Sequence, residues 1–187
     1  MRIITGKAKG LNLKTPKGLM TRPTSDRIKE SLFNILNGMF DFNEKFILDL
    51  FAGTGALGLE AMSRGSKQAV FIDMRTTDII KDNVKRAHFI DDSEILCSDV
   101  FKGITRLSVQ QRQFDLIFCD PPYNKGLCEQ TLIAVDVLNL LSSEGLFIAE
   151  HGIDELIEVS LVNIAFVRQI KYGHTTAIDI FKNDGIN

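Results

Sequence analysis

The sequence predicts an α/β fold in which a mostly parallel sheet is covered by helices and ends in an antiparallel hairpin. Apolar strand-like runs alternate with amphipathic helical runs from residue 46 to residue 150, which is typical of a parallel sheet with helices on both faces. Two further strand-like runs, 165–172 and 176–182, are separated by only three residues. So short a connection requires antiparallel pairing. A chain of 187 residues has the length of one domain.

The elements follow one another in a simple order. Residues 1–20 are interrupted by glycine and proline and predict a hairpin-like arm of short strands, and residues 21–187 predict the α/β domain. N-cap residue types at 21–26 predict a helix after them, with an apolar stripe of Ile28, Leu32, Ile35, Leu36 and Met39. The other expected strands are 46–51, 68–73, 94–98, 114–119 and 146–150, and the other expected helices are 56–64, 76–89 and 127–141.

Charge is distributed unevenly along the chain. The net charge is −2, yet residues 1–30 hold eight Lys or Arg against two acidic side chains, so the remainder is acidic. A basic segment on an acidic body is typical of phosphate binding. A solvated arm that keeps the protein in solution would give the same pattern, and charge alone does not separate the two interpretations.

Composition argues against several classes of protein. No run approaches the roughly 18 apolar residues that cross a bilayer, and the start of the chain lacks the apolar stretch of a secretory signal. We therefore expect a cytoplasmic protein without membrane association. The three cysteines, Cys97, Cys119 and Cys128, lack C-x-x-C spacing, so no metal or disulfide framework is expected. Cys97 and Cys119 lie in predicted strands and are expected to be small core residues.

A glycine-rich loop, residues 49–58, follows the first strand of the α/β domain and opens a helix. In open α/β sheets, ligands bind at the carboxyl ends of the strands. Gly53 and Gly55 remove side chains where the backbone must approach a cofactor closely. The spacing of Gly53, Gly55 and Gly58 also satisfies the dinucleotide fingerprint G-x-G-x-x-G, which by itself is weak support for NAD.

Three aspartates at strand ends favour a different cofactor. Asp49 could bind the ammonium group of a methionine moiety, whereas it would repel the pyrophosphate of NAD. Asp73 is placed to accept hydrogen bonds from ribose hydroxyls, and Asp99 from an adenine amino group. The alternative is that Asp49 and Asp99 only cap the ends of their strands.

The sequence Asp120-Pro121-Pro122-Tyr123 directly follows an apolar strand. Two prolines end a strand and stiffen the turn, because each fixes φ and lacks an N–H. The Asp120 carboxylate and the Pro121 carbonyl then form a pair of fixed acceptors suited to an amino group. Tyr123 can stack on a base. These features predict methylation of an exocyclic amine of a nucleic-acid base, and the alternative is a turn that only ends a strand.

The sequence resembles the RsmD family over essentially its whole length. The likeness rests on Leu-Asp-Leu-Phe-Ala-Gly-Thr-Gly-Ala-Leu-Gly-Leu-Glu-Ala at 48–61, on the Asp-Pro-Pro-Tyr loop and on Tyr-Gly-His-Thr at 172–175. The most specific part is Arg-Pro-Thr-Ser-Asp-Arg-Ile-Lys-Glu-Ser-Leu-Phe-Asn-Ile-Leu at 22–36, together with Arg-Ile-Ile-Thr-Gly at 2–6. Two positions depart from the family: His174 stands where an acidic residue is usual, and Met74-Arg75 replaces a more acidic continuation.

The resemblance implies a Rossmann-like class I methyltransferase with a seven-stranded sheet. It implies S-adenosyl-L-methionine as cofactor, S-adenosyl-L-homocysteine as product and no metal. The implied target is N2 of a guanine at a 966-type position of 16S rRNA, in the small ribosomal subunit or its assembly intermediate, and the expected active form is a monomer. The implied catalytic residues are Asp120, Pro121 and Tyr123; the implied cofactor-binding residues are Asp49, Phe51, Gly53, Gly55, Asp73, Met74, Asp99 and Val100; the implied RNA-binding residues are Arg2, Lys7, Lys9, Lys14, Arg22 and Arg27.

Other functions stay open. An adenine-N6 methyltransferase shares the Asp-Pro-Pro-Tyr loop, although the chain lacks room for a separate DNA-recognition domain. A catalytically silent RNA-binding assembly factor could use the same surface. An NAD-dependent oxidoreductase rests only on the glycine spacing. None of the three histidines, His88, His151 and His174, is expected to be catalytic.

Overall fold

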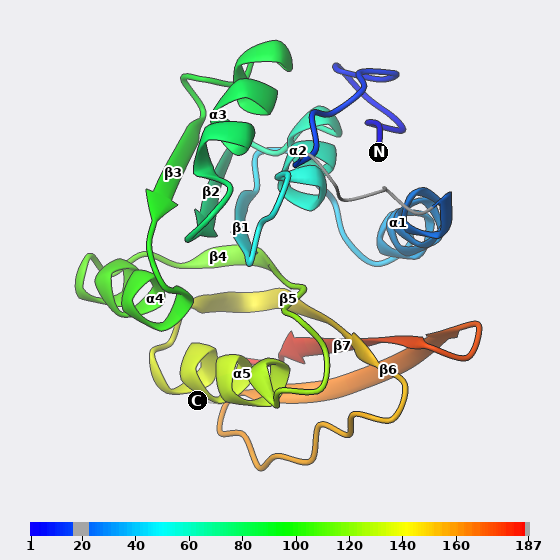
Figure 1. Cartoon of the computed structure of the whole chain (residues 1–187). Coiled ribbons are helices and arrows are strands. Elements are labelled where there is room, and N and C mark those ends of the chain that lie inside the picture. The colour runs from blue at the N-terminus through cyan, green and yellow to red at the C-terminus, as the bar shows by residue number, and fades with distance from the viewer. Residues whose placement is uncertain (17–22, 186–187) are drawn as a thin grey trace. The chain divides into compact units, whose positions relative to one another are not determined.

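The computed structural model describes residues 1–16 and 23–185, and it divides the chain into two compact units, Met1–Cys97 and Ser98–Asn187 (Figure 1). The first unit contains three parallel strands in the order β3-β2-β1, namely β1 (Phe46–Leu50), β2 (Gln68–Asp73) and β3 (Ser93–Cys97). Its helices are α1 (Pro23–Leu36), α2 (Ala56–Ser63) and α3 (Thr77–Arg86). Helix α2 packs on β1 and β2, and α3 packs on β2 and β3.

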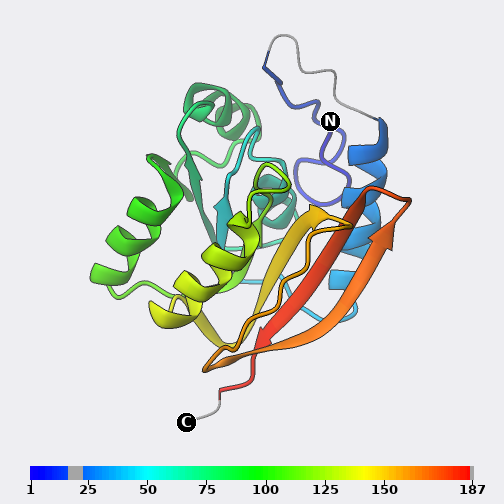
Figure 2. The same ribbon diagram turned by 60° about the horizontal axis from the view of Figure 1, so that its bottom comes forward.

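The second unit contains four strands in the order β4-β5-β7-β6. β4 (Phe114–Cys119) and β5 (Leu141–Gly152) are parallel, whereas β7 (Thr176–Asn183) runs antiparallel to both β5 and β6 (Ile164–Tyr172). Figure 1 shows β6 and β7 as the long orange and red hairpin at the carboxyl end. Figure 2 shows α5 (Leu127–Val137) lying along β5, while α4 (Val100–Val109) precedes β4. The predicted α/β class with its antiparallel hairpin is confirmed.

Burial explains why the strands were predictable. Residues 47–50 of β1 and 69–72 of β2 are buried without interruption, as expected for strands covered on both faces. The helix ends were less predictable. The last helix before β5 ends at Val137, because Asn139 adopts a φ of +50° and breaks the α conformation. The prediction for Met39 was wrong: α1 ends at Leu36, and Met39 is 39% exposed.

Helix α4 is the element that the sequence did not predict. Its N-cap is Asp99, whose carboxylate accepts hydrogen bonds from the N–H groups of Phe101 (3.0 Å) and Lys102 (3.3 Å). Such a cap satisfies N–H groups that have no partner within the helix. In the part of the chain that the structure describes, no helix has the length and apolar character needed to cross a membrane.

The amino-terminal arm, described for residues 1–16, reverses direction and forms one antiparallel bridge, between Arg2 and Asn12. Most of its backbone bonds that reach beyond the arm go to α2. The N–H of Lys7 donates to the Ser63 carbonyl (2.8 Å), and the Ser63 hydroxyl donates to the Thr5 carbonyl (2.5 Å). An added Cβ on Gly6 would lie 1.7 Å from the Ser63 carbonyl oxygen. The arm therefore packs closely on α2 and is held there by hydrogen bonds that are not part of a sheet.

A buried carboxylate fixes the other side of the arm. Glu60 of α2 is fully buried and accepts from the N–H groups of Ile4 (2.7 Å) and Thr5 (3.1 Å). The same carboxylate pairs with Lys29 Nζ (3.3 Å) and Arg64 Nη2 (2.9 Å), and Lys29 also donates to the Arg2 carbonyl (2.6 Å). Lys29 is one of the eight basic residues in the segment 1–30, but it is only 4% exposed. Its charge therefore stabilises the fold through the pair with Glu60.

Candidate functional site

The glycine loop between β1 and α2 has an unusual backbone. Phe51, Gly53 and Gly55 have φ values of +56°, +57° and +76°. Only glycine adopts this region readily, so Phe51 is held there by its surroundings. A Cβ on Gly53 would meet nothing nearer than the Phe51 carbonyl oxygen at 3.8 Å. A side chain at Gly53 would therefore meet no close neighbour, and the cofactor role of Gly53 stays a prediction.

Asp49 lies behind this loop. It is 2% exposed, and its Oδ2 accepts a hydrogen bond from the N–H of Gly58 (2.8 Å). A Cβ on Gly58 would lie 2.5 Å from the Phe71 ring and 3.1 Å from the Asp49 carboxylate, so glycine is required there. Burial raises the pKa of Asp49 to about 7, against the opposing effect of the Gly58 N–H. A cation binding near Asp49 would favour its ionised form, which suits the ammonium group predicted for it.

Asp73 ends β2 and braces the same loop. Its Oδ2 accepts from the N–H of Gly53 (2.9 Å), and its Oδ1 accepts from the N–H groups of Arg75 (2.7 Å) and Thr76 (2.9 Å). Partial burial raises the pKa of Asp73, but these backbone donors together bring it below its usual value. Each carboxylate oxygen has two acceptor sites, so Oδ2 has capacity for a hydroxyl group. The next residue, Met74, is 61% exposed.

The two remaining residues of the predicted cofactor set lie in the second unit. Asp99 caps α4 through its Oδ1, as described above. Val100 is the first residue of that helix and is buried. The sequence left open only a strand-capping role for Asp99, and the structure instead shows it as the N-cap of a helix. Its predicted contact with adenine stays a prediction.

The Asp120-Pro121-Pro122-Tyr123 turn follows β4. Asp120 and Pro122 are exposed and Pro121 is buried. The Tyr123 hydroxyl donates to Glu150 Oε1 of β5 (2.7 Å) and lies 3.4 Å from Thr176 Oγ1 of β7. The Tyr123 hydroxyl is thus tied to two strands of its unit, and the stacking role of the ring stays a prediction.

Glu150 was not identified from the sequence. Burial raises its pKa, and the bond from Tyr123 opposes that change. Burial and the charge of Glu150 in turn raise the pKa of Tyr123, so the phenol keeps its proton and donates it. The available signal was an acidic residue at the end of the apolar run 146–150.

The loop after Tyr123 is held by a second carboxylate. Glu155 accepts from the N–H groups of Asn124 (2.9 Å), Lys125 (3.3 Å) and Gly126 (3.0 Å). Partial burial raises the pKa of Glu155, but the backbone N–H groups together lower it. Asn124 and Gly126 have φ values of +60° and +63°, so the three N–H groups converge before α5 begins. This contact fixes the exit of the Asp-Pro-Pro-Tyr turn.

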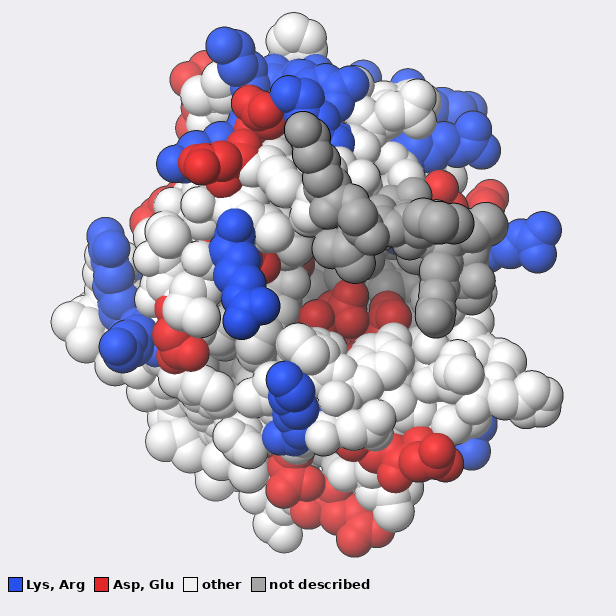
Figure 3. Space-filling view, in the orientation of Figure 1, with Lys and Arg blue, Asp and Glu red and all other residues white. Residues whose placement is uncertain are grey.

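The predicted RNA-binding residues have different surroundings. Arg2, Lys7 and Lys9 are exposed on the arm, and Lys14 pairs with Asp82 of α3 (2.6 Å). Figure 3 shows Lys and Arg side chains gathered at the top of the view, over the region of the arm and α3 in Figure 1. Arg22 lies outside the described residues.

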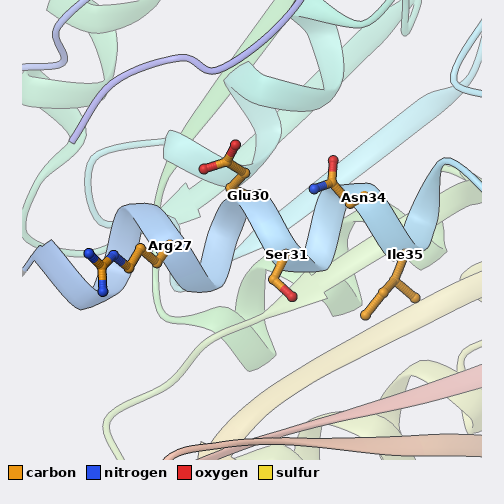
Figure 4. Close-up of a pocket in the computed structure, with 5 residues that line it drawn as sticks. All are labelled: Arg27, Glu30, Ser31, Asn34 and Ile35. Atoms are coloured by element: carbon orange, nitrogen blue, oxygen red, sulfur yellow. The ribbon is translucent and has the colours of Figure 1, made fainter.

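Arg27 is exposed and lines a hollow along one side of α1 (Figure 4). The other residues that line this hollow are Glu30, Ser31, Asn34 and Ile35. These residues belong to the family signature at 22–36, yet none is in the predicted cofactor set. The RNA-binding role of Arg27 stays a prediction.

Several other polar residues have structural surroundings. His151 is buried, with Nδ1 2.9 Å from the Gly152 carbonyl and Nε2 3.3 Å from Asp179 Oδ2. The prediction that Cys97 is a core residue was wrong, because Cys97 is exposed at the end of β3; Cys119 and Cys128 are buried. Among residues 1–16 and 23–185, no group of three or more His, Cys, Asp or Glu side chains is arranged to hold a metal ion.

Comparison with known proteins places these features in a family. A family model described as "Conserved hypothetical protein 95" matches residues 1–181. The chain belongs to the RsmD family. A Haemophilus influenzae protein named "Ribosomal RNA small subunit methyltransferase D" is 32% identical over 157 residues, which cover 83% of this chain and 80% of that protein.

Two further similarities extend over nearly the whole length of this RsmD-family chain. The Bacillus subtilis protein named "Putative rRNA methyltransferase YlbH" is 33% identical over 187 residues, which cover 99% of this chain and 100% of that protein. The solved structure of Escherichia coli yhhF is 28% identical, has a TM-score of 0.83 and covers 98% of each chain. The predicted Rossmann-like class I fold is confirmed.

Proposed function

We propose that this RsmD-family protein transfers a methyl group from S-adenosyl-L-methionine to the N2 amine of a guanine in 16S rRNA, at the 966-type position. Relatives named as small-subunit rRNA methyltransferases support the class of substrate. The observation that carries the chemistry is the turn after β4, where exposed Asp120 precedes a buried proline and a tyrosine tied to Glu150. As substrate we propose the small ribosomal subunit or its assembly intermediate, with a monomer as the active form.

The residues of the glycine loop fit the proposed cofactor. When bound, S-adenosyl-L-methionine supplies an electrophilic sulfonium methyl group. The backbone at Gly53 leaves room for a ligand at the loop, whereas Gly55 allows the left-handed turn to pack against Phe71 and Ile80. Asp73 would accept from the ribose hydroxyls through its remaining acceptor site, and Asp49 would face the ammonium group. Phe51, Met74, Asp99 and Val100 complete the proposed cofactor set.

The residues of the Asp-Pro-Pro-Tyr turn act on the target amine. The Asp120 carboxylate and the Pro121 carbonyl accept hydrogen bonds from its two N–H groups, which orients the nitrogen lone pair. As the N–C bond forms and the S–C bond of the sulfonium breaks, the nitrogen loses one proton, which the Asp120 carboxylate would accept. Tyr123 holds the base by stacking, an interaction worth about 1–3 kcal/mol. The transfer then depends mainly on alignment and needs no covalent intermediate on the protein. A paired base must first leave its stack to reach the turn.

The reaction product tests the proposal directly. The purified protein is incubated with methyl-labelled cofactor and small subunits that lack this methylation, and the RNA is digested to nucleosides. Labelled N2-methylguanosine is the expected product. N6-methyladenosine would contradict the guanine target while keeping the amine chemistry. Cofactor binding without any label would contradict methyl transfer and favour a silent assembly factor.

The variant Asp120→Ala tests the mechanism. We expect the single-turnover rate to fall on the order of 10²–10³-fold, comparable to the loss of one oriented polar group in other active sites. Cofactor affinity should stay nearly unchanged, because Asp120 serves the amine. Asp154→Ala is the control, since Asp154 is an exposed carboxylate of the same unit. Retention of most activity by Asp120→Ala would contradict the proposed role.

A further inference from the structure

One carboxylate on the exposed side of α3, Asp82, pairs with Lys14, and two further cations, Lys85 and Arg86, follow it three and four residues along the same helix. Lys14 Nζ of the arm lies 2.6 Å from Asp82 Oδ2. The hydrogen bond and charge of Lys14, followed by the charges of Lys85 and Arg86, lower the pKa of Asp82. All four residues are exposed. This set, which we name the α3 cluster, therefore has an excess of positive charge at the surface of the first unit.

The arm is held at the α3 cluster by a buried side chain. Asn83 is fully buried, and its Oδ1 accepts from the N–H of Lys14 (2.7 Å) while its Nδ2 donates to the Lys14 carbonyl (3.0 Å). The same Nδ2 donates to the Thr54 carbonyl in the glycine loop (2.9 Å). The backbone at Lys14 is thus fixed on α3 by both of its polar groups. The cluster is built into the fold and does not depend on the Lys14–Asp82 ion pair alone.

Helix chemistry explains only part of this arrangement. Cations in the last turn of a helix are stabilised by its dipole, which accounts for Lys85 and Arg86. It does not account for Lys14, which comes from 68 positions away in the sequence. Charge balance does not account for Lys14 either, because the cluster holds three cations and only one carboxylate. Lys81 on the same helix is already paired with Asp78 at 3.4 Å.

We propose that the α3 cluster binds backbone phosphates of RNA and forms, with Lys7 and Lys9 of the arm, one continuous RNA-binding surface. The inference rests on the proposed function for the identity of the partner, because a rRNA substrate supplies a dense array of phosphates. Lys and Arg side chains that neutralise phosphates release counterions, so each contact appears in the salt dependence of binding. The gathering of Lys and Arg in Figure 3 is consistent with such a surface.

The test compares two variants of equal charge change in the full-length protein. One carries Lys85→Gln and Arg86→Gln. The control carries Arg168→Gln and Lys171→Gln, which removes one Arg and one Lys from exposed positions of β6. Binding to 16S rRNA is measured over a range of KCl concentrations, and thermal unfolding checks that each variant is folded. We expect the slope of log K against log salt to decrease by about 1.4–1.8 in the α3 variant.

Each outcome has a definite meaning. A lower slope in the α3 variant and an unchanged slope in the control support the surface. An unchanged slope in the α3 variant overturns it, and so does an equal decrease in both variants, because net charge is then the cause. A second variant, Asp82→Asn, should bind RNA more tightly than the wild type; weaker or equal binding overturns the proposal. Wild-type protein that binds RNA but yields no N2-methylguanosine would instead refute the proposed function.

Discussion

The substitution Glu60→Gln tests how the arm is held. In the wild type, one buried carboxylate accepts from the N–H groups of Ile4 and Thr5 and pairs with Lys29 and Arg64. A glutamine of the same shape offers one acceptor oxygen and places an NH₂ group against the remaining donors. Breaking a buried ion pair by removing one partner costs about 3–5 kcal/mol. We expect the lower end, about 3 kcal/mol, because one acceptor oxygen survives.

Chemical denaturation and thermal unfolding measure this loss. For a chain of this length, about 3 kcal/mol corresponds to a decrease of about 6–12 °C in Tm. Amide exchange should accelerate at Ile4 and Thr5, whose N–H groups lose an acceptor. The control is Glu30→Gln, which removes an exposed carboxylate one residue from Lys29 and should change the stability by less than about 0.5 kcal/mol. Adding Lys29→Met to Glu60→Gln should recover part of the loss.

The variant should also respond to pH. Burial lowers the pKa of Lys29 and the charge of Glu60 raises it, with a net decrease from 10.5. Without the Glu60 charge, the pKa of Lys29 in the folded protein falls further. At pH values between this pKa and that of Lys29 in the unfolded chain, the unfolded chain binds more protons than the folded one. Stability of Glu60→Gln therefore rises as the pH increases towards 10.5. The ion-pair argument would be refuted if Glu60→Gln were as stable as Glu30→Gln and its stability did not rise with pH.

Two other predictions concern the arm and the Asp-Pro-Pro-Tyr turn. Gly6→Ala should destabilise the protein by roughly 1–3 kcal/mol more than Gly10→Ala does. Both glycines have a positive φ, but only at Gly6 is the position of an added Cβ blocked, by Ser63. Equal unfolding free energies of the two variants would contradict this. Glu155 has a lowered pKa, so its contact with residues 124–126 should be complete above pH 4.5 and be lost as the pH falls through the folded-state pKa. Amide exchange at 124–126 measures this, and a Glu155→Gln variant with the same pH profile as the wild type would argue against it.

The strands could be predicted from the sequence because burial on both faces leaves a local pattern. β2 and β4 have the predicted bounds, and the other strands begin or end within a few residues of them. Helix α4 is absent from the sequence prediction, which gives its capping residue, Asp99, only the roles of adenine ligand or strand cap. The same carboxylate in fact starts a helix, which a pattern of Asp before an amphipathic run could have indicated.

The candidate site was predictable where its residues follow strand ends, and unpredictable where it depends on distant contacts. Gly53 and Tyr123 lie in loops that follow strands, and Asp73 ends its strand, all as the sequence predicts. Glu60 and Asn83, which hold the arm, contact residues 55 to 69 positions away. Each contact is a single polar pair without a repeating pattern, so nothing in the local sequence indicates it.

The three cysteines differ enough in exposure to make the native chain suitable for selective chemical labelling. Cys97 is exposed at the end of β3, with its Sγ 4.0 Å from the Met74 carbonyl, whereas Cys119 and Cys128 are buried. Burial also raises the pKa of the Cys119 thiol well above its usual value, which suppresses the reactive thiolate. A maleimide fluorophore should therefore attach at Cys97 without any cysteine being removed. It would give an optical signal beside Met74, through which occupancy of the glycine loop could be followed in real time.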